Sequence, residues 1–164
     1  DGCTNLKTAD CGNNVQNMAY AYSRCNSLTT ANCGNNVQNM AYAYSNCNSL
    51  TTAVCGNKVR DISFAYYCSP NICGNTYFFS NMIASARNCF YGRNNSKRLN
   101  IYTPINTETT NTILETSWST SIVESSIVWI NSVAVKGCYY NTRYNIYVYP
   151  VEDVYLARWE NGDA

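Results

Sequence analysis

The sequence predicts an α+β chain in which a short, disulfide-laced repeat of strand, turn and helix is followed by an antiparallel β-rich domain. Three observations lead to this prediction. Residues 11–32 and 33–54 are two copies of one 22-residue unit and agree at 20 of 22 positions. The chain contains ten cysteines, most of them spaced at the repeat period. Beyond residue 98, glycine becomes scarce and β-branched and aromatic residues dominate.

The 22-residue unit indicates a stacked repeat, and partial copies stand on both sides of the two full ones. Residues 3–10 match the end of the unit, and residues 55–68 match its beginning. Units of this length stack because one unit alone cannot bury its apolar face. We therefore expect files of equivalent side chains along the stack: Leu6, Leu28 and Leu50; Ala9, Ala31 and Ala53; Val15, Val37 and Val59; and Met18, Met40 and Ile62.

Each unit is predicted to consist of a short strand, a turn and a helix that returns to the next strand. Residues 15–25 predict the helix, because apolar residues recur there at helical spacing on one face. These residues are Val15, Met18, Ala19, Tyr22 and Cys25. Residues 27–33 predict the strand, and the Gly-Asn pair that follows Cys33 indicates the turn.

The chain is predicted to contain two domains joined by a linker. Residues 73–89 look like a degenerate further unit, so the repeat domain is placed at residues 1–90. Residues 91–98 are polar and basic, which is typical of a linker. Residues 99–164 contain short runs with alternating apolar positions, and they predict about five to seven strands in an antiparallel sheet.

The repeat, including the stretch YAYSNCNSLTTAVCGNKVRDISFAYYC at residues 42–68, is similar to the BspA type of leucine-rich repeat. The positions that carry the resemblance are Leu28, Ala31 and Cys33 in the strand, Val37 and Met40 after it, then Ala43-Tyr44, Cys47 and Leu50. The resemblance covers residues 3–68. It implies parallel strands on a concave face, a role in surface adhesion or recognition, and no catalytic activity. A bundle of disulfide-laced helices, as in small secreted ciliate pheromones, is the alternative architecture.

The even number of cysteines favours disulfides and an oxidising, extracellular compartment. The cysteines are Cys3, Cys11, Cys25, Cys33, Cys47, Cys55, Cys68, Cys73, Cys89 and Cys138. Equivalent residues on neighbouring units of a stack lie about 4.8 Å apart, within reach of a disulfide. A stack would allow pairs such as Cys3–Cys25, Cys11–Cys33, Cys47–Cys68 and Cys55–Cys73. A helical bundle would pair Cys3–Cys11, Cys25–Cys33, Cys47–Cys55 and Cys68–Cys73. Both schemes leave Cys89 to bond Cys138.

Six side chains of the repeat are candidates for a contact surface. The repeat places tyrosines and threonines at the same positions in successive copies, which would give an aromatic ladder and a flat threonine array. The six are Tyr20, Tyr42, Tyr22, Tyr44, Thr30 and Thr52. Asn94 begins an Asn-Asn-Ser sequon and is the candidate glycosylation site.

The composition argues against an enzyme. The chain contains no histidine, the usual general base and the commonest metal ligand. It also contains no Gly-rich phosphate loop and no Cys-x-x-Cys pair. No catalytic residue, cofactor site or metal site is therefore predicted. The net charge of +1 gives no reason to expect a nucleic-acid partner, and no apolar run is long enough to span a membrane.

The uneven distribution of charge favours self-association. Residues 1–98 carry eight basic and three acidic side chains, a net +5, whereas residues 99–164 carry three and seven, a net −4. A short stack also has an uncovered end, and a head-to-tail contact that does not close forms a filament. The sequence thus predicts a secreted structural protein that self-associates into extracellular fibres or matrix. The alternative is a secreted recognition, adhesion or signalling protein that binds a receptor or glycan.

Overall fold

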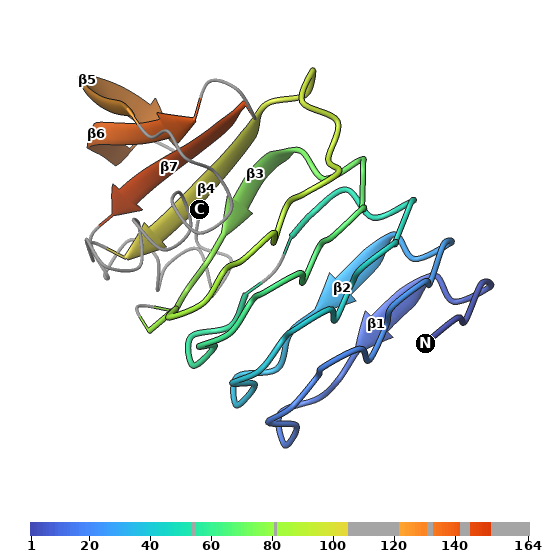
Figure 1. The fold of residues 1–164 in the computed structure, drawn as a ribbon. Helices are drawn as coiled ribbons and strands as arrows, with labels where there is room; N and C mark the ends of the chain where they lie inside the picture. Colours follow the sequence, from blue (N-terminus) through green and yellow to red (C-terminus); the bar gives the residue numbers. More distant parts are fainter. Residues whose placement is uncertain (54, 81, 105–121, 131–132, 142–144, 152–164) are drawn as a thin grey trace.

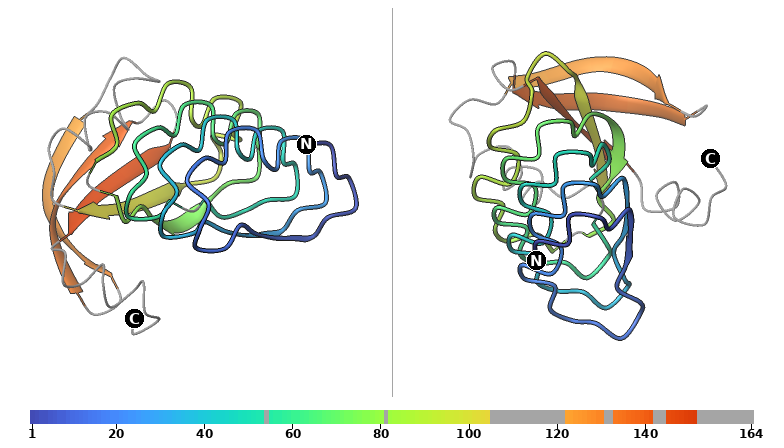
Figure 2. Two further views of the ribbon diagram at one scale, coloured as in Figure 1. Left: turned by 90° about the horizontal axis from the view of Figure 1, so that it is seen from below. Right: turned by 90° about the vertical axis from the view of Figure 1, so that its right-hand side faces the viewer.

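The N-terminal part of the chain winds into four stacked coils, and the last coil continues into a β-sheet (Figure 1). The computed structural model describes residues 1–53, 55–80, 82–104, 122–130, 133–141 and 145–151, with the backbone alone in 122–130, 133–141 and 150–151. We define the coils as residues 8–29 (coil 1), 30–51 (coil 2), 52–73 (coil 3) and 74–98 (coil 4). Figure 2 shows the coils one behind another, with coil 1 at the end farthest from the sheet.

The coils stack in register, and on one side of the stack short strands of neighbouring coils pair in parallel. Strand β1 (Thr8–Asp10) pairs with strand β2 (Thr30–Asn32), with Thr8 opposite Thr30. On another side, isolated parallel bridges place Asn39 opposite Asp61 and Asp61 opposite Ser85. The files of equivalent residues expected from the 22-residue period therefore do lie above one another, and the register changes by two residues at coil 4.

The coils lead into a five-stranded mixed sheet with the order β3-β4-β7-β6-β5. Its strands are β3 (Gly74–Tyr77), β4 (Leu99–Pro104), β5 (Ile122–Ile130), β6 (Val133–Asn141) and β7 (Ile146–Val151). Strand β4 is parallel to both β3 and β7, and only the pairs with β6 are antiparallel. The predicted antiparallel β-rich domain is therefore wrong, because β4 and β7 extend the parallel stacking of the coils. The division of the chain at residues 91–98 stays a prediction.

The predicted helix is also wrong, since the described residues contain no helix. Residues 17–25 and their equivalents form consecutive turns instead. Tyr20 and Arg24 have left-handed φ angles of 61° and 60°, and Tyr42 and Asn46 repeat them at 56° and 57°. A right-handed helix cannot continue through a left-handed residue at every fourth position. The fold is therefore a stack of strands and turns, and not of strands and helices.

The helical spacing arose because the core-facing residues of a coil also recur at intervals of three or four. In coil 2 the buried apolar residues include Val37, Met40, Ala43, Tyr44, Cys47 and Leu50. A helix and a tightly turning coil leave the same sparse apolar pattern over one turn of the repeat. Only the path of the backbone distinguishes them, and hydrophobic spacing does not record that path.

Backbone groups in the turn segments are paired by a ladder that runs in one direction. In coil 2, Met40 N–H donates to the Asp61 carbonyl of coil 3 at 2.8 Å, and Tyr44 N–H donates to the Ala65 carbonyl at 2.8 Å. The intervening Ala43 N–H closes a local turn onto the Met40 carbonyl at 2.9 Å. From Met40 to Asn46 each inter-coil bond points its N–H toward the next coil, so this stretch presents carbonyl oxygens to the coil before it. Just before it the direction is reversed, because the N–H groups of Gln38 and Asn39 donate to the Gln16 carbonyl of coil 1 at 2.8 and 3.3 Å.

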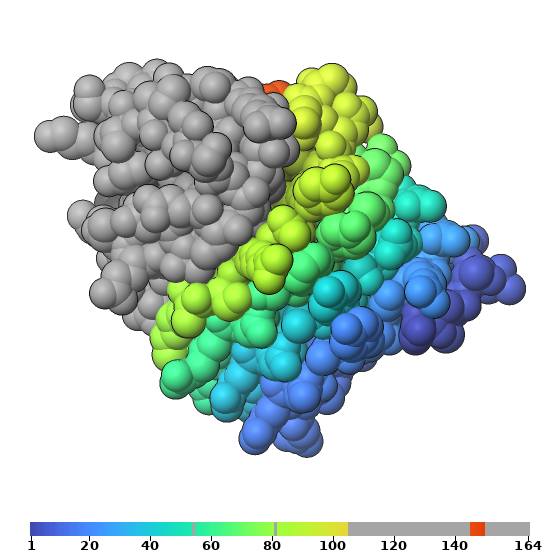
Figure 3. Space-filling model, in the orientation of Figure 1, coloured from blue at the N-terminus to red at the C-terminus, as the bar shows by residue number. Residues whose placement is uncertain are grey.

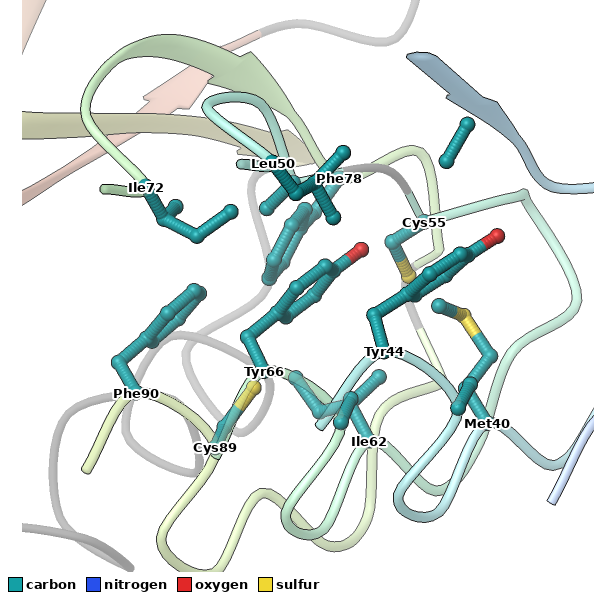
Figure 4. Packing of buried hydrophobic residues seen from close by; sticks show 14 of the residues in the cluster. Met40, Tyr44, Leu50, Cys55, Ile62, Tyr66, Ile72, Phe78, Cys89 and Phe90 are labelled. Carbon is teal, nitrogen blue, oxygen red and sulfur yellow. The ribbon is translucent and has the colours of Figure 1, made fainter. Parts of the chain in front are cut away.

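Aromatic rings stacked along the solenoid axis form the centre of the core. Tyr22, Tyr44, Tyr66 and Phe90 come from successive coils, with ring centroids 5.7, 5.5 and 5.6 Å apart. Figure 4 shows the last three rings side by side and surrounded by aliphatic side chains. The ring contacts extend to Phe78, whose centroid lies 6.1 Å from that of Phe90. The core is continuous from coil to coil, so each coil is stabilised by its neighbours.

Replacing Tyr44 by phenylalanine is expected to stabilise the protein. The Tyr44 hydroxyl is buried and has no hydrogen-bond partner among the described residues, and burial raises its pKa above the usual value of 10.0. A buried hydroxyl without a partner costs about 1–3 kcal/mol. We expect Tyr44→Phe to raise the free energy of unfolding by about 1 kcal/mol in urea titrations. The half-buried Tyr42 is the control, and a stability loss in Tyr44→Phe that Tyr42→Phe lacks would contradict this account.

Candidate contact surfaces

Among the described residues, little covers the outer side of coil 1, which lies at the edge of the stack drawn in Figure 3; we call this side the open end of coil 1. In coil 2 the carbonyls of Asn39 and Ala41 accept N–H groups from coil 1, at 2.8 and 3.0 Å. The equivalent carbonyls of coil 1, Asn17 and Ala19, receive no backbone N–H from the part of the chain that the structure describes. Only the later part of this edge is covered, where Gly2 N–H donates to the Ser23 carbonyl at 2.7 Å. The outer edge of coil 1 therefore carries hydrogen-bond acceptors at Asn17 and Ala19, next to the N–H groups of Gln16 and Asn17, whose equivalents in coil 2 donate to coil 1.

Apolar side chains are also incompletely covered at this end. Val15 and Tyr22 are half-buried, whereas their equivalents Val37 and Tyr44 in coil 2 are fully buried. Tyr20 is 55% exposed, the highest value among the exposed large apolar residues. The open end thus combines carbonyls that the described residues leave unpaired with partly exposed apolar surface.

The outer aromatic file consists of Tyr20, Tyr42 and Phe64, the left-handed residues at equivalent positions of coils 1 to 3. Their ring centroids lie 4.6 Å apart in each pair and the rings are nearly parallel, at 6° and 2°. Because stacked rings cover one another's faces, the file leaves two end faces, the outer face of Tyr20 and the far face of Phe64, and Tyr67 lies against Phe64 at a centroid distance of 5.5 Å. The outer face of Tyr20 is therefore the more open of the two to a sugar ring. Of the four tyrosines predicted for contact, Tyr20 and Tyr42 belong to this file, whereas Tyr44 lies in the core and Tyr22 is half-buried.

The threonine array lies on the side of the coils that carries β1 and β2. Thr8, Thr30 and Thr52 are exposed at equivalent positions, and Thr29 and Thr51 lie beside them. Asp10 and Asn32 share the outward face of these strands, so the array is one threonine wide along each strand. Thr30 and Thr52 therefore stay candidates for contact with a partner.

A second file of tyrosines on the sheet was not predicted. Tyr77, Tyr102 and Tyr149 come from β3, β4 and β7, and their ring centroids lie 5.3 and 5.2 Å apart. Beside them, the Asn100 amide donates to the Asn75 side-chain oxygen at 3.0 Å. The three tyrosines are not spaced at the repeat period, so the sequence carries no periodic signal for this file.

The hydrogen bonds between coils align the cysteines differently from the pairs expected from their spacing in the sequence. Cys47 N–H donates to the Ser69 hydroxyl at 3.0 Å, so Ser69 and not Cys68 follows Cys47 in its file. Cys73 N–H donates to the Thr51 carbonyl at 3.0 Å, as Thr29 N–H does to that of Lys7. Cys73 therefore follows Thr29 and Thr51 at the equivalent position of coil 3. The structure contains no disulfide among the nine cysteines that it describes. The side chain of Cys138 lies outside the described residues, so Cys89–Cys138 stays a prediction.

A shallow cleft of about 260 Å³ opens at the corner of coils 2 and 3 and is lined by Asn32, Cys33, Asn35, Cys55, Gly56, Tyr77 and Phe79. Its lining contains neither a carboxylate nor a basic side chain. Burial raises the pKa of Cys33 to about 11 and that of Cys55 well above 9.0. Both thiols therefore stay protonated at neutral pH, where a protonated thiol is a poor nucleophile.

The candidate glycosylation site lies in an exposed turn. The side-chain oxygen of Asn94 accepts the Ser96 N–H at 3.1 Å and the Ser96 hydroxyl at 2.8 Å. Asn94, Asn95 and Ser96 are all exposed. The sequon is therefore accessible, and its modification stays a prediction.

Comparison with family models, with curated proteins and with solved structures finds no match. The resemblance to BspA-type repeats therefore stays a prediction. No group of three or more cysteine or carboxylate side chains in the described residues is arranged to hold a metal ion. Within the same residues, the structure has no helix with the length and apolar character that a bilayer crossing needs.

Proposed function

We propose that this chain is a non-enzymatic structural protein that self-associates outside the cell, and that the open end of coil 1 is one of its contact surfaces. The observation that carries the proposal is the identity of coils 1 and 2. Residues 8–29 and 30–51 agree at 20 of 22 positions. The outer side of coil 2 is covered by coil 1, whereas the nearly identical outer side of coil 1 is largely uncovered. A surface of this chemistry packs against a neighbouring coil within the chain, which supports its use as a contact surface between chains.

The polarity of the ladder favours a head-to-tail contact. The open end of coil 1 presents the carbonyls of Asn17 and Ala19, so two copies that met through these two residues would place acceptor against acceptor. A contact with a different part of the second copy, one that offers N–H groups, avoids this conflict. The net +5 of residues 1–98 and net −4 of residues 99–164 favour the same arrangement. Such a contact does not close by symmetry, and it can therefore propagate into a filament.

Sedimentation of the full chain at rising concentration tests the proposal. We expect the weight-average mass to rise well above 18.4 kDa toward millimolar concentration, and to fall when salt is added. Tyr20→Lys places a charge on the open end and should weaken association about tenfold. Gln38→Lys adds the same charge to the exposed wall of coil 2 and serves as the control.

Two results would count against self-association through coil 1. One is a chain that stays monomeric at millimolar concentration. The other is equal weakening by Tyr20→Lys and Gln38→Lys, which would place the contact elsewhere. A monomer that binds a glycan array and loses binding in Tyr20→Lys would instead favour the recognition alternative, since Tyr20 carries the open ring face of the outer aromatic file.

A further inference from the structure

Two files of three cysteines run along the solenoid. The first file contains Cys3, Cys25 and Cys47, and the second contains Cys11, Cys33 and Cys55. The members of the first file begin the same local turn in successive coils, because their carbonyls accept the N–H of Leu6, Leu28 and Leu50 at 3.2, 3.1 and 3.3 Å. Each file ends after three members. Ser69 follows Cys47, and Phe78 is bridged to Cys55.

Within each file the thiols approach the neighbouring coil. The sulfur of Cys47 lies 3.1 Å from the Tyr22 carbonyl oxygen, which also accepts the Cys25 N–H at 3.3 Å. The Cys47 thiol is therefore beside the backbone of Cys25. In the second file, the sulfur of Cys11 accepts the N–H of Gly34, the residue after Cys33, at 3.2 Å. A Cβ atom on Gly56, the residue after Cys55, would lie 3.6 Å from the sulfur of Cys33.

Coil spacing limits which thiols can bond. Stacked strands lie about 4.8 Å apart, inside the range of about 4.4–6.8 Å between the Cα atoms of a disulfide. Residues two coils apart are separated by about twice that spacing, which is too far. The outer members of a file therefore cannot bond each other, and the middle member can bond only one neighbour at a time.

We propose that each file forms one disulfide, which always includes the middle cysteine, Cys25 or Cys33, and either of its neighbours. A small disulfide such as oxidised glutathione is the oxidant. The thiolate of the middle cysteine, whose population grows as the pH approaches the raised pKa of about 11 for Cys33, attacks one glutathione sulfur, forms a mixed disulfide and releases one glutathione. A neighbouring thiolate then attacks the middle sulfur, closes the inter-coil bond and releases the second glutathione. The two protons lost by the cysteines end on the two glutathione thiols.

The remaining thiol of each file allows the bond to change partner without an oxidant. In the first file, the thiolate of Cys47 can attack the sulfur of Cys25 in a Cys3–Cys25 bond and release Cys3 as the thiolate. The file places attacking, central and leaving residues in one line along the solenoid axis. Burial raises the pKa of Cys47 to about 11, so this exchange should be slow at neutral pH and faster as the pH approaches that value.

Mapping disulfides in the full chain tests the proposal. The chain is equilibrated with oxidised glutathione, its free thiols are alkylated, and it is cleaved after aromatic residues without reduction. Cleavage after Tyr42 and Tyr44 separates Cys25 and Cys33 from Cys47 and Cys55. Each resulting peptide carries one member of each file, so fragment ions from tandem mass spectrometry are needed to assign the bonded cysteine and the alkylated one. They should show Cys25 joined to Cys3 or Cys47, and Cys33 joined to Cys11 or Cys55. Loop pairs such as Cys25–Cys33, or the absence of any inter-coil pair, would overturn the proposal.

Two matched serine variants sharpen the test. Cys25→Ser removes the middle member, so the number of disulfides should fall by one. Cys47→Ser removes an outer member, so the number should stay the same, with the bond found at Cys3–Cys25. Equal losses in the two variants would contradict the sharing of a middle cysteine. If a variant does not fold, the fragment map of the unmodified chain still decides between the outcomes.

Discussion

Gly34→Ala is expected to be among the most destabilising single-methyl additions in the repeat. A Cβ atom at position 34 would overlap the carbonyl oxygen of Gly12 and lie 3.0 Å from its carbonyl carbon. These atoms belong to the backbone of the neighbouring coil, so they cannot move aside as a flexible side chain does. Coils 1 and 2 would have to separate at this corner, with loss of the bond from Gly34 N–H to the Cys11 sulfur. We expect a loss of about 4 kcal/mol.

Equivalent glycines in the same file provide graded controls. In Gly56→Ala the new Cβ would lie 2.9 Å from the Gly34 carbonyl oxygen, so the neighbouring coil has less to move. Gly12→Ala would meet nothing within 4 Å, but Gly12 has a φ angle of 72°, and a left-handed alanine costs about 1–2 kcal/mol. We expect Gly34→Ala to be the most harmful of the three in urea titrations. Equal effects of Gly34→Ala and Gly12→Ala would contradict the close stacking of these backbones.

Because coil 1 is the first coil of the described stack, Gly34→Ala should change hydrogen exchange unevenly along the chain. Gly34→Ala can release coil 1 while coils 2 to 4 stay folded, because the repeat transmits stability only between neighbours. Hydrogen exchange would then accelerate first at Met18, Tyr20 and Tyr22, whose N–H groups donate to coil 2. The amides of coil 3 should be nearly unaffected. Uniform acceleration throughout the chain would indicate that the coils unfold as a single unit.

The sequence was sufficient to predict which residues stack, but not the path that connects them. Two nearly identical units impose the same environment on equivalent residues, so Ala9 lies opposite Ala31 and Leu28 and Leu50 share one core. The path within a unit depends on left-handed residues such as Tyr42 and Asn46. Tyrosine is not a residue that signals a left-handed turn, so the apolar spacing was read as a helix. Hydrogen bonds between the coils compensate for the conformational energy that the left-handed φ angles cost.

The difference in cysteine register has a similar origin. A stack predicts the pairs Cys47–Cys68 and Cys55–Cys73, because the spacing within each pair is near that of the repeat. The structure instead places Ser69 after Cys47, so Cys68 lies one residue out of register, and it bridges Phe78 to Cys55. Extra residues between coils 3 and 4 shift the register there, and residue identity alone does not show where they are accommodated. The 22-residue period thus aligns the first three cysteines of each file, whereas the residue that follows them could be located only from the contacts between coils.

Arg93→Met is expected to destabilise the junction between the coils and the sheet. The sequence places Arg93 in a polar segment, yet it is only 5% exposed. Its guanidinium donates to the carbonyls of Ile72 at 3.2 Å, Lys97 at 2.5 Å and Asn145 at 3.2 Å, which belong to segments far apart in the sequence. Burial lowers its pKa to about 10, which still leaves it charged at neutral pH.

Methionine fills similar space but leaves these carbonyls without their donor, so Arg93→Met should cost about 3–5 kcal/mol. Arg93→Lys keeps the charge, but one ammonium group cannot reproduce the planar fork that reaches separate carbonyls, so an intermediate loss is expected. Arg87→Met, at an exposed position of the same coil, should change stability by less than about 0.5 kcal/mol. Hydrogen exchange offers a second readout, because Leu99 N–H donates to the Asn145 carbonyl at 3.0 Å and should lose protection first. An Arg93→Met variant as stable as Arg87→Met would show that the buried guanidinium does not hold β7 against the last coil.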